Sequence, residues 1–548
     1  MTPGKGRRSR ARPARSSTAA QPRRSSPRAP IAAVGLAIAA SLLPWHFGAL
    51  AAQEGARIAA GSADAVRAAR AYRRAHAAPI LREFMELLAI PNVASDEANI
   101  RRNADWLVAA LERRGIDARA LDGLGGPPPV YGELPVPGAT RTLVFYAHYD
   151  GQPVDTARWT YPPWQPVLLS GPVERGGRPV ELEPDATSDA IDPDWRIYAR
   201  GAGDDKAPVA AILAALDALR EAGMAPTSNL KFFFEGEEEA GSAHLAEVLR
   251  ANAELLAADG WLIMDGPVHQ SRRPQLFFGV RGYTGLQITV YGANRYLHSG
   301  HYGNWAPNPA LDLARLLASM KDERGHVLIE GFHDDTAPIG EEERAAIAAA
   351  SPFDDRLRVE LGLAATEADD APYLERMLIP SLNVRGLQSG TTGPTARNVI
   401  PPSATASLDI RLAKGNDPER MLDLVEAHVR GRGYHVVLQD PDSTTRAAHP
   451  RIARIDRSPG YRAARVPLDA PLARDVIGAA SEAAGEEPIL APTLGGSLPL
   501  YLFEEVLGTP AVGVPIANHD DNQHAPDENL RVGNLWYGID LVAAIMTM

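Results

Sequence analysis

The sequence predicts an α/β protein whose mainly parallel sheet has helices on both faces and is interrupted by a smaller α+β unit. Apolar runs typical of buried strands alternate with helical patterns along most of the chain. A middle stretch differs, because its strands alternate between apolar and polar residues, as half-exposed strands do. At 548 residues, the chain is long enough for two or more domains.

The N-terminal segment has the composition of an export signal. Residues 1–51 contain nine Lys or Arg and no acidic residue, and the apolar run IAAVGLAIAASLL is followed by small residues. This order predicts a signal peptide that is cleaved before Ala52, and hence a periplasmic or secreted protein with a short lead-in over 52–74. The alternative is an uncleaved anchor in the inner membrane, although Pro44 and His46 shorten the apolar run.

Charge and cysteine content exclude several classes of protein. Removing the nine N-terminal basic residues from the 56 Lys and Arg leaves 47 basic against 68 acidic side chains, a formal charge of −21. So acidic a body is a poor binder of nucleic acid. The chain contains no cysteine, which excludes both a disulfide framework and a thiolate metal site.

The larger predicted unit comprises residues 75–282 and 461–548. Buried strands are predicted for the apolar runs in TLVFYAHYD, NLKFFFEG, GWLIMDGP and TPAVGVPIANHDD. Between the first two, APVAAILAALDALREAG has a helical apolar stripe and Pro208 in its first turn. Strands that alternate with helices favour a parallel sheet covered by helices.

The middle stretch, residues 283–460, predicts a smaller sheet with helices on one side. Apolar residues occupy every second position in GLQITVYG and in ATASLDIRLA, where Asp409 and Arg411 lie on the opposite face. The segment DPERMLDLVEAHVRGRG predicts a helix with Asp417 as its N-cap and Pro418 at its first position.

Carboxylate and imidazole side chains gather where the predicted strands of the larger unit end. His148 and Asp150 follow one strand, Glu235 to Glu239 another, and Asp265 a third, while Asp204 lies in a turn before a helix. Ligands of open α/β sheets bind outside the carboxyl ends of the strands. Carboxylates gathered there would destabilise the fold unless a cation held them together. Without cysteine, this donor set favours Zn²⁺, Mn²⁺ or Co²⁺, although each motif alone also fits a solvated polar loop.

Taken together, the motifs resemble the M20 family of metallopeptidases, in the dipeptidase branch that includes carnosinases. The resemblance covers roughly residues 75–548. It implies a catalytic domain interrupted by a ferredoxin-like lid and dimerisation domain, and a homodimer formed through that lid. The matching stretches are HYDGQPVD, RGAGDDKAP, EGEEEAGS, MDGP, LHSGHYG, NVIPPSATASLDIRL, GGSLP and HAPDE.

The resemblance also implies roles for individual residues. Two divalent ions, zinc in the first place and manganese or cobalt as alternatives, would share Asp204, and the Asp204–Asp205 peptide bond would be cis. Glu238 would be the general base, Asp150 would orient His148, and His298 would stabilise the oxyanion, in many relatives from the partner subunit. The implied residues are the metal ligands His148, Asp204, Glu239, Asp265 and His524, the catalytic residues Glu238, Asp150 and His298, and the substrate-binding residues Asn398, Arg411, Gly496 and Ser497.

The sequence therefore predicts a dinuclear metal-dependent hydrolase that cleaves the amide bond of dipeptides or short peptides with a metal-activated water. One alternative keeps the scaffold and changes the substrate to N-acyl amino acids. A second is a non-catalytic exported protein that binds metal or peptide, which the presence of Glu238 disfavours. Arg411 also fits a surface salt bridge, and no role is assigned to Glu235, Glu237, His301 or His519.

Overall fold

The computed structural model describes residues 58–548 with the exception of residues 60, 369–370 and 497. The predicted signal segment and Ser497 therefore lie outside the described residues. Within the described ranges, no helix combines the length and the apolar character needed to cross a membrane.

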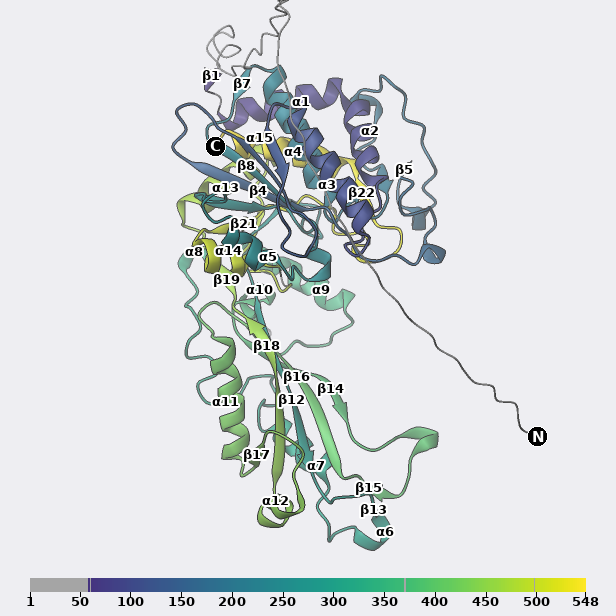
Figure 1. The fold of residues 1–548 in the computed structure, drawn as a ribbon, viewed down its shortest axis with the longest axis vertical. Helices are drawn as coiled ribbons and strands as arrows, with labels where there is room; N and C mark the ends of the chain where they lie inside the picture. The colour runs from purple at the N-terminus through teal and green to yellow at the C-terminus, as the bar shows by residue number, and fades with distance from the viewer. Residues whose placement is uncertain (1–57, 60, 369–370, 497) are drawn as a thin grey trace, which may run out of the picture. The chain divides into compact units, whose positions relative to one another are not determined.

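The larger sheet has eight strands, in the order β2-β3-β8-β4-β9-β21-β10-β20. Figure 1 labels β4, β8 and β21 of this sheet. Its four central strands, β8, β4, β9 and β21, run parallel, whereas β2 and β3 at one edge are antiparallel. The predicted α/β class is confirmed. The strands are β2 (Asp117–Ala120), β3 (Val130–Leu134), β4 (Thr142–His148), β8 (Asn229–Glu235), β9 (Gly260–Ile263), β10 (Gln275–Phe277), β20 (Ile489–Ala491) and β21 (Ala511–Gly513).

Helices cover both faces of this sheet, as the three consecutive phenylalanines of β8 show. Phe232 and Phe234 pack into one core, whereas Phe233 packs into the other, because successive side chains of a strand point to opposite faces. A strand buried on both faces reads as a continuous apolar run. The first core includes α1 (Ser62–Ala75), α2 (Ala77–Leu88), α3 (Glu97–Glu112), α4 (Lys206–Glu221), α13 (Pro471–Ala484) and α15 (Val532–Met546); the second includes α5 (Leu245–Ala251) and α14 (Leu500–Leu507).

The smaller sheet has five strands, in the order β14-β16-β12-β18-β17. Alternate residues of β16 are buried, as the sequence predicts, and Asp409 and Arg411 lie on the opposite, partly exposed face. The buried face packs with two helices into a separate core. These elements are β12 (Gly282–Tyr291), β14 (Ser381–Gln388), β16 (Ser403–Leu412), β17 (His435–Val437), β18 (Ile452–Tyr461), α7 (Pro309–Ala318) and α11 (Pro418–Gly431).

Two short pairings position segments that matter for function. β22 (Asn529–Arg531) pairs with β6 (Arg196–Tyr198), which also pairs with β5 (Val167–Leu169). β13 (Leu297–His298) pairs with β15 (Val399–Ile400) at the end of the smaller sheet that is remote from the larger one (Figure 1). The remaining elements are β1 (Ile58–Ala59), β7 (Met224–Ala225), β11 (Gly279–Val280), β19 (Ala464–Arg465), α6 (Ser299–Tyr302), α8 (Glu341–Ala350), α9 (Asp354–Glu360), α10 (Tyr373–Met377) and α12 (Ser443–Ala448).

The predicted limits of the middle unit fall close to the outer ends of β12 and β18. Part of that range packs elsewhere, however, because Ala346 of α8 belongs to the first core of the larger sheet. Arg465 also reaches Glu343 of α8, with an Nε–Oε1 distance of 3.3 Å. The domain boundaries at 283 and 460 therefore stay predictions.

Candidate active site

Several of the predicted site residues come from the ends of neighbouring parallel strands. His148 is the last residue of β4, and it pairs with Glu235 at the end of β8. Asp265 follows β9, which pairs with β4 on its other side. Because the carboxyl ends of parallel strands meet at one edge of a sheet, these side chains and those of Glu238 and Glu239 converge.

Asp204 comes from a turn between β6 and α4 that one carboxylate holds in place. Glu528 accepts hydrogen bonds from the backbone N–H groups of Gly201 and Gly203, both at 2.9 Å, and of Asp204 at 3.0 Å. Its other partner is the buried Arg200 guanidinium, whose Nη1 donates at 2.6 Å. Glu528 immediately precedes β22, so this carboxylate ties the C-terminal loop to the turn. The sequence contained Glu528 within HAPDE, but nothing in the motif indicated this contact.

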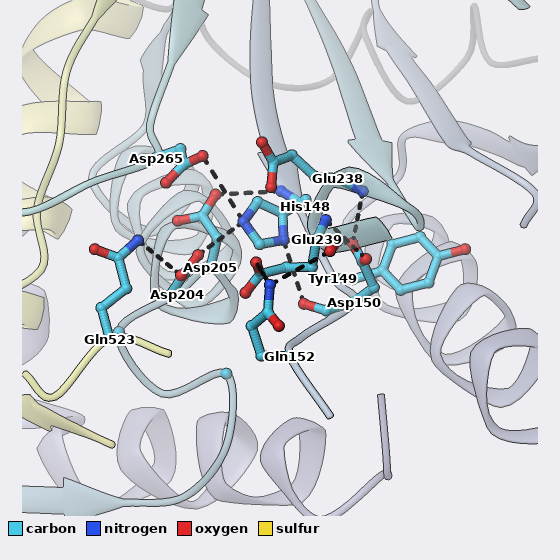
Figure 2. Close-up of polar contacts among 12 residues, drawn as sticks. His148, Tyr149, Asp150, Gln152, Asp204, Asp205, Glu238, Glu239, Asp265 and Gln523 are labelled. Atoms are coloured by element: carbon cyan, nitrogen blue, oxygen red, sulfur yellow. Dashed lines mark hydrogen bonds and ion pairs between the residues drawn. The ribbon is translucent and has the colours of Figure 1, made fainter. Parts of the chain in front are cut away.

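The five predicted metal ligands form two clusters that share Asp204. Figure 2 shows His148, Asp204, Asp265 and Glu239. In the first, His148 Nε2 lies 2.8 Å from Asp204 Oδ1 and 3.8 Å from Asp265 Oδ2. In the second, His524 Nε2 lies 3.1 Å from both Asp204 Oδ2 and Glu239 Oε2. Asp204 thus offers one oxygen to each cluster. The Asp204–Asp205 peptide bond is cis, as expected.

The donor set of both clusters fits divalent ions. In each cluster, the potential ligand atoms lie within 4.8 Å of one another. Among the described residues, the buried Glu239 Oε1 has no hydrogen-bond partner, which is expected of an oxygen that coordinates a cation. One imidazole and two carboxylates per cluster suit a metal such as Zn²⁺ with an open coordination position.

Asp150 connects the two loops that carry the ligands. Its Oδ1 lies 3.4 Å from His148 Nδ1, and its backbone oxygen lies 3.2 Å from the same nitrogen. The two carboxylate oxygens also accept the backbone N–H groups of Glu238 and Glu239, both at 3.1 Å. The geometry agrees with the prediction that Asp150 orients His148, and it adds a second task, because Asp150 also fixes the loop of Glu238.

Glu238 is partly exposed and lies beside the first cluster, among several negative side chains (Figure 2). Burial, as the largest cause, and the charges of Asp265, Glu235 and Asp204 together raise the pKa of Glu238 to about 9, whereas His148 opposes the shift. Burial and the charge of Asp204 likewise raise the pKa of Asp265 to about 7. Without cations, Glu238 therefore holds its proton at pH 7 in the folded protein, and Asp265 is about half protonated there.

Several polar groups around the clusters could not be foreseen from the sequence. Gln152 Nε2 donates to Glu239 Oε2 at 2.8 Å, and Gln523 Nε2 donates to Asp204 Oδ2 at 2.7 Å. These amides hold the carboxylate oxygens that the second cluster uses. A glutamine next to a loop histidine gives no recognisable pattern, so only the structure reveals these contacts.

The unassigned carboxylates of the EGEEEAGS stretch have structural partners. Glu235 is buried and accepts a hydrogen bond from the Tyr146 hydroxyl at 2.7 Å. Glu237 accepts the backbone N–H of His244 at 2.6 Å. Neither belongs to a ligand cluster within the described residues.

The other predicted residues contribute no atom to either cluster among the described residues. His298 is exposed at β13, where Ser299 N donates to Asn398 O at 3.0 Å, so His298 and Asn398 lie close together. Neither belongs to a ligand cluster of the described chain. Arg411 lies 3.5 Å from Asp409, measured from Nε to Oδ1, and Gly496 is exposed.

A model of the peptidase family M20/M25/M40 matches residues 144–548. The chain belongs to that family. It is similar to human Beta-Ala-His dipeptidase, with 28% identity over 432 residues, 76% of each chain. It is also similar to the Cys-Gly metallodipeptidase of Saccharomyces cerevisiae, with 27% identity over 490 residues that cover 84% of this chain and 93% of the relative.

A solved structure supports the same assignment. The M20 family metallo-carboxypeptidase from Sulfolobus solfataricus superposes with a TM-score of 0.65 and 28% identity, covering 85% of this chain and 98% of that one. The predicted resemblance and the predicted enzyme class, a metallopeptidase, are therefore confirmed. As an M20 member with two clusters of imidazole and carboxylate donors, the chain uses divalent metal ions.

The protons held by the metal-free clusters predict a pH dependence of stability. Hydrogen bonds to Asp204 and Glu239 raise the pKa of His524 to about 10. The pKa values of Glu238, Asp265 and His524 are thus all higher in the folded protein than in the unfolded chain, so the folded protein keeps protons that the unfolded chain has released. Groups with a raised pKa contribute stability that is lost as the pH rises. We therefore expect the free energy of unfolding of the metal-free protein, measured in urea with a chelator, to fall between pH 5.5 and pH 8.5.

Bound metal replaces those protons, so zinc is expected to remove most of this decline. Glu238→Gln is expected to reduce the decline in the metal-free protein, because Gln does not titrate. A metal-free protein that becomes more stable across this range would show that the cluster is not protonated as described.

Proposed function

We propose that this M20 protein hydrolyses the amide bond of dipeptides or short peptides at a site that holds two divalent ions. The observation that carries the proposal is that Asp204 belongs to both clusters: its Oδ1 lies next to His148 and its Oδ2 lies next to His524. The names of both relatives reported above, a Beta-Ala-His dipeptidase and a Cys-Gly metallodipeptidase, support a dipeptide substrate.

The side chains around the clusters fit this chemistry. Two adjacent divalent ions, when bound, would lower the pKa of a water molecule and polarise the scissile carbonyl. Glu238 would take the proton and deliver it to the leaving amine. Its raised pKa belongs to the metal-free protein; cations nearby would favour the carboxylate form that a base requires. Asp150 would hold Glu238 in place through its backbone N–H.

Zinc is the metal that we propose. Imidazole and carboxylate donors, together with the absence of any cysteine, fit a catalytic zinc site. Manganese and cobalt have related preferences for these donors, so metal analysis of the purified protein decides between them.

We also propose that the protein acts as a homodimer in which His298 serves the partner's site. β12 has ten residues and therefore spans roughly 33 Å, and His298 lies beyond its far end. A side chain at that place cannot reach the clusters of its own chain without a large movement. The edge strand β14 is exposed from Asn383 to Gln388, including Val384 and Leu387, and offers an unpaired edge for association.

We also propose that the protein is exported. Export is supported by the basic residues, apolar run and small-residue site within residues 1–51, with the uncleaved anchor as the alternative. The N-terminal sequence of the protein isolated from its host, starting at Ala52 or earlier, distinguishes cleavage from anchoring.

Glu238 and Glu239 are adjacent and chemically alike, yet the proposal gives them different tasks. Glu238→Gln is expected to keep both metals and to lower kcat by roughly 10²–10⁴-fold, the range for lost general acid–base catalysis. Glu239→Gln is expected to weaken one metal site, with partial recovery of activity in excess metal. Metal content and kcat are measured on both variants.

Glu237→Gln is the matched control, because this neighbour contacts His244 and no ligand cluster of the described residues. We expect it to keep both its metal content and its turnover. Loss of metal from Glu238→Gln together with full metal binding by Glu239→Gln would contradict the assignment and exchange the two roles.

Mixing two inactive variants tests whether His298 acts in the partner's site. His298→Ala and Glu238→Gln homodimers are each expected to have little activity, whereas one of the two sites of a mixed dimer contains both intact residues. Activity should therefore return toward a quarter of the wild-type value after subunit exchange, because about half of the dimers are then mixed. Exchange proven by mass spectrometry without any recovery would mean that His298 does not act in trans.

A further inference from the structure

Two arginine side chains meet on one tyrosine at the partly exposed face of the smaller sheet. Arg385 of β14 donates from Nη1 to the Tyr283 hydroxyl at 3.0 Å and from Nε to Ser407 Oγ at 2.9 Å. The Arg411 guanidinium lies over the Tyr283 ring, 5.4 Å from its centroid. Tyr283 and Arg411 are cross-strand partners in β12 and β16, so the sheet fixes this arrangement.

Arg385 is bound only by neutral oxygens in the described part of the chain, where no carboxylate lies within ion-pair distance of it. Arg454, on β18 of the same sheet, is different, because it pairs with both Asp440 and Asp456. Asp409 lies near Arg411 and offsets one of the two cations at Tyr283. Arg385 has no such compensation among the described residues, and it is exposed.

A third arginine adds to the positive charge at this place. Arg281 is buried just before β12, and its Nη2 donates to Ser381 Oγ at 3.0 Å and to the Ile379 carbonyl at 2.7 Å. Ser381 is the cross-strand partner of Arg411. Burial and the charge of Arg411 lower the pKa of Arg281 to about 10. A neighbouring anion would relieve this repulsion.

An aromatic chain connects the arginines with a segment that is expected to bind substrate. The Tyr283 ring lies 6.1 Å from that of Tyr461, which stacks on Tyr501 with a centroid distance of 4.9 Å. Tyr501 belongs to α14, which begins four residues after Gly496 of the GGSLP stretch. The arginines therefore lie on the side of the smaller sheet that meets this part of the larger unit.

We infer that the enzyme prefers peptides whose C-terminal residue is Asp or Glu, with the α-carboxylate on Arg411 and the side-chain carboxylate on Arg385. The inference rests on the proposed peptidase function and names its substrate class. Guanidinium groups bind carboxylates through paired hydrogen bonds, and Arg385 can exchange its weak neutral acceptors for such a partner. Arg385 is then a specificity-determining residue, and the Tyr283 hydroxyl and Ser407 position its side chain.

The test compares two dipeptides that differ only in charge, Ala-Glu and Ala-Gln, with zinc-loaded enzyme. We expect wild-type kcat/KM to favour Ala-Glu about fivefold, the size of a partly exposed ion pair, and to lose most of this preference in 0.5 M salt. Arg385→Gln should bring the ratio close to one. Arg385→Glu should favour Ala-Lys over Ala-Gln. Arg454→Gln is the matched control, and its ratio should equal that of the wild type.

Two failures are distinguishable. If the wild type hydrolyses both dipeptides equally well, or if Arg385→Gln keeps the preference for Ala-Glu, the substrate inference is wrong and the peptidase function stands. If the metal-loaded wild type hydrolyses no dipeptide, the proposed function is wrong and the inference falls with it. Circular dichroism of each variant shows whether a changed ratio comes from a folded protein.

Discussion

The mutual repulsion of closely spaced carboxylates is the constraint on which this site depends. Asp150, Asp204, Asp265, Glu238 and Glu239 converge at one edge of the larger sheet, while His148 and His524 are the imidazoles among them. Burial and neighbouring charges raise the pKa of Glu238 and Asp265 in the metal-free protein. Protonation of these carboxyl groups then relieves the repulsion. Divalent ions relieve it better, because each can contact several oxygens at once.

The scaffold provides the rigidity that such crowding requires. Parallel strands bring His148 and the loops of Asp265 and Glu238 to one edge, but Asp204 and His524 arrive on loops. The Glu528 carboxylate joins these two loops by accepting three backbone N–H groups of the Asp204 turn. The ligand set is thus positioned by hydrogen bonds from outside the clusters, as is usual for metal sites.

The sequence predicts those features that depend on local patterns. The three phenylalanines of β8 require burial on both faces, and the alternation of β16 requires one buried face, so both sheets could be predicted. The order of motifs predicted all five residues that form the two clusters. Contacts such as Glu528 with the Asp204 turn join residues more than 300 positions apart through polar side chains, and no periodicity marks them. The packing of Ala346 of α8 into the first core of the larger sheet was not predicted either, because it joins apolar residues far apart in the sequence.

The most direct test of the account is the number of zinc ions that the purified protein and two variants bind, measured by mass spectrometry under native conditions. The account predicts two ions per wild-type chain, one for Asp265→Asn, which changes a ligand of one cluster, and none at comparable affinity for Asp204→Asn, because both clusters share that carboxylate. A wild-type chain that binds a single ion, or an Asp204→Asn chain that keeps one ion at wild-type affinity, would contradict a site built on a shared aspartate.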